Sequence, residues 1–123
     1  MAFLTDRKRA TGLGSARTGT AHFWQMQLTA ATLAVLLPLF VFTFGHVLGA
    51  SHEAVAAYYA RPFPAIVAAL TIVVGFLHFR MGAQVMIEDY VHGAARRWLI
   101  LAVAWVSYGA MATGLFALIR LAL

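Results

Sequence analysis

The thirteen residues from His78 to Tyr90 hold most of the side chains in this chain that could do chemistry. His78 and Arg80 lie inside an otherwise apolar stretch, and an Asp89-Tyr90 pair stands where that stretch ends. Ionisable groups are costly in lipid, so each of them needs a partner or a role. At ~100° per residue, His78 and Asp89 differ by about 20° around a helix. One helix face therefore carries a possible metal ligand in mid-segment and an acid at its end.

The spacing predicts a depth for His78. It lies eleven residues before Asp89, which is ~16 Å along a helix axis. With Asp89 at the membrane surface, His78 lies near the middle of the ~30 Å hydrocarbon layer. A neutral imidazole there can ligate haem iron, and Gly75 and Gly82 on the same stripe would leave room for a porphyrin face. Two alternatives stay open, which are a hydrogen bond to a neighbouring helix and proton transfer.

A haem held by two histidines needs a second ligand. His22 and His46 belong to another predicted helix, and both fall near membrane edges. We therefore expect a partner subunit to supply the other axial ligand of any haem bound by His78.

Arg80 stands two residues after His78 and so points about 200° away around the helix. Its long side chain allows three possible interactions. It could donate to a haem propionate, pair with an acid or carbonyl of a partner helix, or reach lipid phosphate.

Asp89 and Tyr90 have the chemistry of a quinone site. A tyrosine hydroxyl can donate a hydrogen bond to a quinone carbonyl, and a carboxylate can support proton uptake on reduction. Both are also ordinary residues of a membrane interface, so the pair alone does not decide the matter.

The rest of the chain predicts membrane-embedded helices. The 123 residues are 63% hydrophobic and 11% charged, whereas a soluble domain has roughly 25% charged residues. The apolar stretches 28–50, 63–87 and 98–119 each reach the length of about 20 residues that a span needs, and a lone span must be a helix. We predict an all-α integral membrane fold, with a basic tail over residues 1–21 and a three-helix anchor over 22–123 whose spans cover about 22–50, 63–90 and 97–120.

The basic residues predict the orientation. They gather before the first span and before the third, as Arg7, Lys8, Arg9, Arg17, Arg96 and Arg97. By the positive-inside rule the N-terminus is cytoplasmic, and this distribution argues against nucleic acid as the reason for the net charge of +5. Three helices make a thin bundle, so we expect a second anchor subunit to complete it.

Several local signals refine the helices. Pro38 should kink the first span, Ser51 should cap a short helical turn after it, and Pro64 suits the first turn of the second span. Ala110 and Gly114 form a small-residue pair that favours close helix packing.

Other features limit the function. The chain has no cysteine, so it cannot hold an iron–sulfur cluster of the usual Cys-ligated kind. No apolar run directly follows the N-terminal basic residues, so a cleavable signal peptide is not expected. Residues 11–20, rich in Gly, Ser and Thr, predict either an extended tail lying on a partner or on lipid, or a disordered one.

A group of residues near the end of the second span resembles the signature of a known family: His78, Gly82, Gln84, Asp89, Tyr90 and Val91. The family is the succinate dehydrogenase hydrophobic membrane anchor subunit, the D-type cytochrome b subunit of respiratory complex II, in its alphaproteobacterial form. Its pattern is a histidine, an Asp-Tyr pair eleven positions on, and then valine. The resemblance covers most of the chain, from about Gly14 to the third span. It departs at Gln27, where many relatives carry an arginine.

The resemblance implies a specific role. His78 would be an axial ligand of haem b, shared with a histidine of the C-type cytochrome b subunit. Tyr90 would hydrogen-bond ubiquinone, with Asp89 beside it. The complex would also contain a flavoprotein subunit that oxidises succinate and an iron–sulfur subunit, and it would lie in the bacterial inner membrane. This multi-pass chain would hold no catalytic residue for succinate itself.

Two other classes compete with this reading. The first is a structural anchor or assembly subunit without redox ligands. The second is a small multidrug-type transporter, which needs an acid within the membrane. The chain places Glu88 and Asp89 at a membrane edge and Glu53 in a loop, which argues against a transporter.

Overall fold

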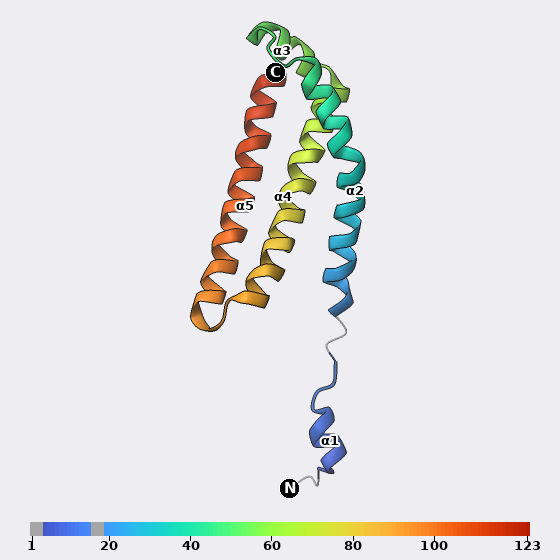
Figure 1. Cartoon of the computed structure of the whole chain (residues 1–123), viewed down its shortest axis with the longest axis vertical. Helices are drawn as coiled ribbons and strands as arrows, with labels where there is room; N and C mark the ends of the chain where they lie inside the picture. Colours follow the sequence, from blue (N-terminus) through green and yellow to red (C-terminus); the bar gives the residue numbers. More distant parts are fainter. Residues whose placement is uncertain (1–3, 16–18) are drawn as a thin grey trace.

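The part of the chain that the structure describes, residues 4–15 and 19–123, is a set of helices without a strand. In this computed structural model the helices are α1 (Asp6–Thr11), α2 (Gly19–His46), α3 (His52–Tyr59), α4 (Pro62–Tyr90) and α5 (Gly93–Ala122) (Figure 1). Helices α2, α4 and α5 are long and apolar enough to cross a membrane. The predicted all-α membrane fold with three spans is confirmed.

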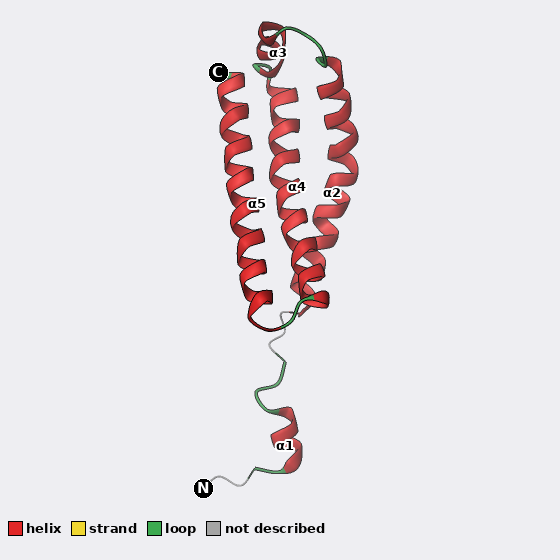
Figure 2. Cartoon of the chain, turned by 60° about the vertical axis from the view of Figure 1, so that its left-hand side comes forward, coloured by secondary structure: helices red, strands yellow, loops and turns green. Residues whose placement is uncertain are grey.

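Helix α4 is the central span. The three long helices lie side by side with α4 between α2 and α5 (Figure 2). Helix α4 packs against both neighbours, whereas α2 and α5 do not contact each other, and the short α3 packs across the ends of α4 and α5. The span that carries His78 is therefore the one with a helix on each of two sides.

The boundaries of α2 differ slightly from the prediction. It begins at Gly19 rather than His22, and it ends at His46 rather than near residue 50. The chain then turns through Gly49, whose φ of 80° lies in the left-handed region that favours glycine. Pro38 lies inside α2, and Figure 1 shows this helix bending in its upper half, as expected where a proline removes a backbone donor.

The connection from α2 to α4 follows the capping signals. The Ser51 hydroxyl accepts a hydrogen bond from the backbone N–H of Ala54 at 3.4 Å and caps α3, as predicted. Helix α4 begins at Pro62, one residue earlier than expected, and Pro64 also falls in its first turn. Proline suits this position because the first N–H groups of a helix have no partner within the helix.

The N-terminal segment contains a helix that we did not predict. Thr5 caps α1 by accepting a hydrogen bond from the Lys8 N–H at 3.3 Å. Helix α1 contacts no other helix of the described residues. After it, residues 12–15 form turns and irregular backbone. Of the predicted extended tail over residues 11–20, Thr11 lies in α1 and residues 19–20 begin α2. Residues 16–18, with Arg17, lie outside the described residues.

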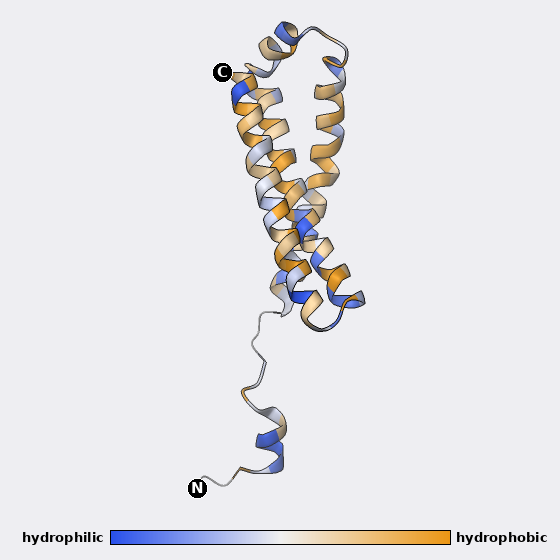
Figure 3. Ribbon diagram, turned by 90° about the vertical axis from the view of Figure 1, so that its left-hand side faces the viewer, coloured by the Kyte–Doolittle hydropathy of each residue, from blue (hydrophilic) through white to orange (hydrophobic). Residues whose placement is uncertain are grey.

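The bundle buries little of its own surface. Within their most apolar windows, α2, α4 and α5 have only 11%, 17% and 6% of residues buried. Figure 3 shows apolar residues over most of the three helices, with hydrophilic ones toward the ends and in the lower half of the bundle. Lipid or another protein must therefore cover most of the outer surface, because water would expose it at a large free-energy cost.

A small core lies at the α3 end of the bundle. Val47, Tyr59 and Ala68 are buried together there. Burial raises the pKa of Tyr59, and the neighbouring Tyr58 adds to the effect, so the Tyr59 phenol stays protonated. His46 is exposed at the same end, and its ring centroid lies 5.4 Å from that of Tyr58. His46 thus sits at an edge of the bundle, as expected.

Candidate functional site at the middle and end of α4

His78 turns toward α2. Its side chain is half-buried, and its Nδ1 atom lies 2.9 Å from the Thr29 Oγ1 atom of α2. The hydrogen bond to a neighbouring helix, one of the alternatives left open by the sequence, is therefore present. The other ring nitrogen, Nε2, makes no hydrogen bond to the described residues.

Helix α4 has open space at two glycines and an apolar groove beside it. A Cβ atom added at Gly75 or at Gly82 would meet nothing within 4 Å. A groove of about 430 Å³ lies between α2 and α4, and its wall is almost wholly apolar. It is lined by Phe40, Thr71, Ile72, Gly75, Phe76 and Phe79. Gly75 lines this groove, whereas His78 and Gly82 do not, so the porphyrin face predicted from the sequence stays a prediction.

The set of possible metal ligands is small. Residues 4–15 and 19–123 contain no cluster of three or more His, Cys, Asp or Glu side chains that could hold a metal ion. A haem brings four nitrogen ligands of its own, and the protein adds only axial ones. His78 could therefore serve as one axial ligand of a haem, and a second axial ligand would have to come from another residue or subunit.

Arg80 faces the opposite neighbour, α5. Its Cζ atom lies 5.7 Å from the ring centroid of Tyr108, a cation–π geometry that stabilises a guanidinium away from water. Its Nε atom is buried without a hydrogen-bond partner among the described residues. The predicted divergence of His78 and Arg80 around the helix is thus found. The contact with Tyr108 was missed because it depends on the relative register of α4 and α5.

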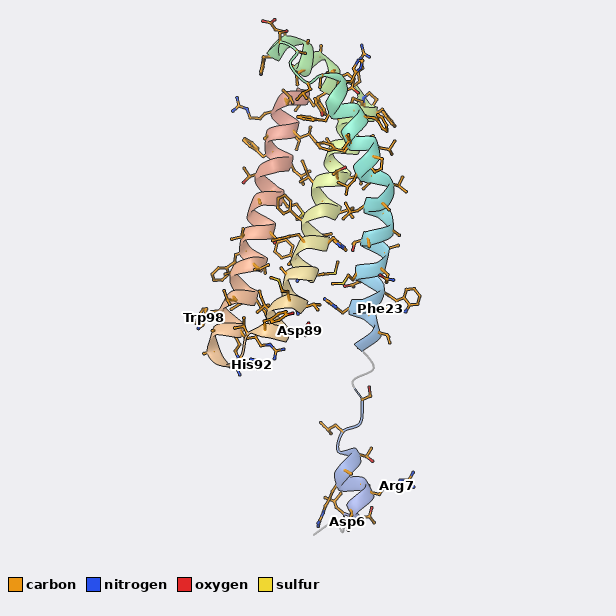
Figure 4. The ribbon with its side chains drawn as sticks, in the orientation of Figure 1. Asp6, Arg7, Phe23, Asp89, His92 and Trp98 are labelled. Carbon is orange, nitrogen blue, oxygen red and sulfur yellow. The ribbon has the colours of Figure 1, made fainter. Side chains whose placement is uncertain are left out.

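Asp89 and Tyr90 are the last two residues of α4 and are both exposed. Tyr90 is 81% exposed. Figure 4 shows Asp89 at the same end of the bundle as Phe23 of α2 and Trp98 of α5. Neither the Asp89 carboxylate nor the Tyr90 hydroxyl has a hydrogen-bond or ion-pair partner within the described part of the chain. Both side chains are therefore available to a ligand or a partner subunit.

Glu88, which precedes this pair, is held within the fold. Its Oε1 atom accepts a hydrogen bond from Gln84 Nε2 at 3.0 Å and lies 3.6 Å from Arg96 Nη2 of α5. Both members of the ion pair are partly exposed, so it contributes little stability. Its effect is to tie the end of α4 to the start of α5 beside the free Asp89.

Comparison with known proteins decides the family. A family model described as the succinate dehydrogenase/fumarate reductase transmembrane subunit matches residues 2–116. The chain belongs to this family. It is 42% identical over 123 residues to the succinate dehydrogenase hydrophobic membrane anchor subunit of Paracoccus denitrificans, covering 100% of this chain and 95% of the relative. No solved structure matches it significantly. The resemblance seen in the sequence is confirmed, and the protein is a multi-pass membrane anchor subunit.

In this anchor subunit the site residues predicted from the sequence lie in three different places. His78 is central and faces α2, Arg80 faces α5, and Asp89 and Tyr90 lie at the exposed end. Thr29, the direct partner of His78, was not predicted from the sequence. A threonine within an apolar span does not specify which residue of a neighbouring helix it meets.

Proposed function

We propose that this anchor subunit serves a succinate:quinone oxidoreductase, respiratory complex II, in the bacterial inner membrane. Its partners would be a C-type cytochrome b subunit, an iron–sulfur subunit and a flavoprotein subunit. In this role His78 is an axial ligand of haem b, and Tyr90 with Asp89 contributes to the site of ubiquinone reduction. The observation that carries the proposal is the placement of His78 on the central span, with its Nε2 atom free of any partner among the described residues and with open space at Gly75 and Gly82 of the same helix.

The residues around His78 support a redox role. Haem b, when bound, would supply reversible one-electron chemistry. His78 would hold its iron from α4, and the hydrogen bond to Thr29 limits rotation of the imidazole ring. Gly75 and Gly82 keep side chains away from the adjacent surface. The apolar groove between α2 and α4, which includes Gly75, offers a surface that an apolar ring could cover.

The end of α4 supports quinone chemistry. The Tyr90 hydroxyl can donate a hydrogen bond to a quinone carbonyl. The exposed Asp89 carboxylate can accept a proton from water and pass it toward the reduced quinone. Because Glu88 is already paired with Gln84 and Arg96, Asp89 is the acid at this end that remains free. The quinone would approach from the membrane boundary, where both side chains are exposed.

The role of Arg80 remains a prediction. Its unpartnered Nε atom leaves a donor for a carboxylate such as a haem propionate. Its contact with Tyr108 directs the guanidinium toward α5, away from the Thr29–His78 pair. A propionate that meets Arg80 would therefore have to reach the α5 side of α4.

The second candidate is a structural anchor without redox ligands. The hydrogen bond between His78 and Thr29 favours it, because a buried histidine satisfied by a neighbouring helix needs no cofactor. The two candidates differ at Nε2 of His78. A structural histidine leaves this nitrogen unused, and an axial ligand uses it.

The test is the His78→Ala variant of the purified complex. We expect the dithionite-reduced b-type absorption to disappear or fall sharply, because the iron loses one axial ligand. His46→Ala is the matched control, since His46 is exposed at the other end of the bundle, and it should keep the full spectrum. A wild-type spectrum from His78→Ala would favour the structural anchor.

A further inference from the structure

We propose that Thr29 is a positioning residue for His78. Its hydroxyl oxygen accepts the hydrogen bond from Nδ1–H and so selects the imidazole tautomer whose Nε2 lone pair is free to bind iron. The proposal rests on the proposed function, because it concerns the ligand role of His78.

The direction of the hydrogen bond follows from the surroundings of the Thr29 hydroxyl. Its Oγ1 atom lies 2.9 Å from the carbonyl oxygen of Gln25 and 2.9 Å from that of Met26. A hydroxyl has one proton, and a carbonyl oxygen can only accept. If that proton pointed at His78, two carbonyl oxygens would face the Thr29 lone pairs at hydrogen-bond distance with no hydrogen between them. The proton therefore points at the carbonyls.

With the hydroxyl proton used, Thr29 can only accept from His78. The Nδ1 atom, 2.9 Å away, must then carry the ring hydrogen. In a neutral imidazole the other nitrogen is left with the lone pair. That nitrogen is Nε2, which has no hydrogen-bond partner among residues 4–15 and 19–123. Thr29 thus prepares the ring for ligation at Nε2, the nitrogen that it does not hold.

The same hydrogen bond tunes the ligand. A ring N–H that donates to an oxygen makes the opposite nitrogen more basic and holds the ring plane. A more basic ligand stabilises ferric over ferrous iron. Removing the acceptor should therefore raise the midpoint potential of the haem and loosen its binding. Loss of such a partner typically weakens metal binding about 10–100-fold.

The experiment compares three variants in the purified four-subunit complex. Thr29→Val keeps the shape but removes the acceptor, and Thr29→Ser keeps a hydroxyl. Thr32→Val is the matched control, because Thr32 lies one turn further along α2 and its hydroxyl bonds only to the Leu28 carbonyl, at 2.8 Å. The readouts are the haem midpoint potential, the g values of the ferric haem, and the rate of haem transfer to apomyoglobin.

We expect Thr29→Val to shift the potential upward, to change the g values, and to speed haem transfer by about 10–100-fold. Thr29→Ser should restore wild-type values, and Thr32→Val should not alter them. A wild-type potential and transfer rate in Thr29→Val would overturn the role of Thr29. Equal shifts in Thr32→Val would also overturn it, because they would report a general effect of threonine loss in α2.

His78→Ala separates this proposal from the proposed function. If haem is lost from His78→Ala while Thr29→Val behaves as wild type, His78 is a ligand and Thr29 does not position it. If His78→Ala retains the wild-type haem spectrum, the ligand role itself fails and takes this proposal with it.

Discussion

His78 and Tyr90 belong to one helix but to two environments. The imidazole is half-buried among apolar helices, where an unpartnered polar atom is costly. The phenol is 81% exposed at the end of α4, where water can satisfy it. A hydrogen bond to His78 therefore affects both the stability of the fold and the orientation of the imidazole ring. A hydrogen bond from Tyr90 matters only when a ligand replaces water.

This difference gives a prediction for Tyr90→Phe. The variant removes one neutral hydrogen bond to the quinone, worth about 1 kcal/mol, so quinone reduction should fall roughly five- to tenfold. Succinate oxidation with an artificial acceptor that bypasses the membrane site should stay unchanged. The measurement is the ratio of the two rates in the purified complex.

Tyr58→Phe is the control for this ratio, because Tyr58 lies on α3 beside His46, at the other end of the bundle. It should leave the ratio as in wild type. Equal loss of both activities in Tyr90→Phe would count against a direct contact between Tyr90 and the quinone.

At the scale of the helices, α4 is held on two sides by different means. Toward α2 it makes the hydrogen bond from His78 to Thr29. Toward α5 it packs closely at Gly114, where an added Cβ atom would lie 3.4 Å from Ile72 Cγ2. This contact confirms the packing signal that Gly114 gave in the sequence. The α4–α5 interface thus depends on small size, and the α2–α4 interface includes a polar pair in mid-span.

The Gly114 contact predicts a size limit. Gly114→Ala should be tolerated, because its Cβ atom makes an ordinary contact with Ile72. Gly114→Leu should lower the thermal stability of the complex, because overpacking costs about 1–3 kcal/mol. Thermal unfolding of the detergent-purified complex measures this.

The combination of Gly114→Leu with Ile72→Ala provides the check. It should recover part of the lost stability, since the smaller Ile72 side chain makes room for the leucine. If the double variant is no more stable than Gly114→Leu alone, the strain does not lie at the α4–α5 contact.

The helices themselves were largely predictable, and their mutual contacts were not. Long apolar stretches determine that a segment spans the membrane, and Ser51 signalled the start of α3 before the structure showed it. The end of α2 was misplaced because Val47 and Leu48 continue the apolar run, although Gly49 turns the chain. Thr29 and Tyr108 could not be assigned as partners of His78 and Arg80. Such pairs depend on the rotation and register of two helices, which a single sequence does not encode locally.

At the scale of the whole molecule, the three spans do not form a closed interior. Helices α2 and α5 touch α4 but not each other, and only 17% of the most apolar part of α4 is buried. Association of spans in lipid depends on close packing and polar contacts between helices. An open arrangement with an exposed apolar groove is therefore expected to gain most from a second membrane subunit.

This open arrangement predicts which proteins co-purify with the chain. Affinity purification of the tagged chain from native membranes in mild detergent should yield a second multi-span subunit, an iron–sulfur protein and a flavoprotein in equal amounts. The flavin and iron contents of the preparation quantify the last two. Recovery of the chain without a flavoprotein would contradict its assignment to complex II.

Helix α4 also fixes the position of His78 relative to Asp89. It runs without interruption from Pro62 to Tyr90, so both the axial offset and the azimuth between His78 and Asp89 are set by residue count alone. Inserting one residue between them would swing the acid about 100° around the axis while lengthening the gap by only ~1.5 Å. The loops on either side of α4 can change length at little cost. An insertion between His78 and Asp89 keeps both residues on one helix face only if it adds whole helical turns. An insertion or deletion of any other length would therefore change both their separation and their relative direction.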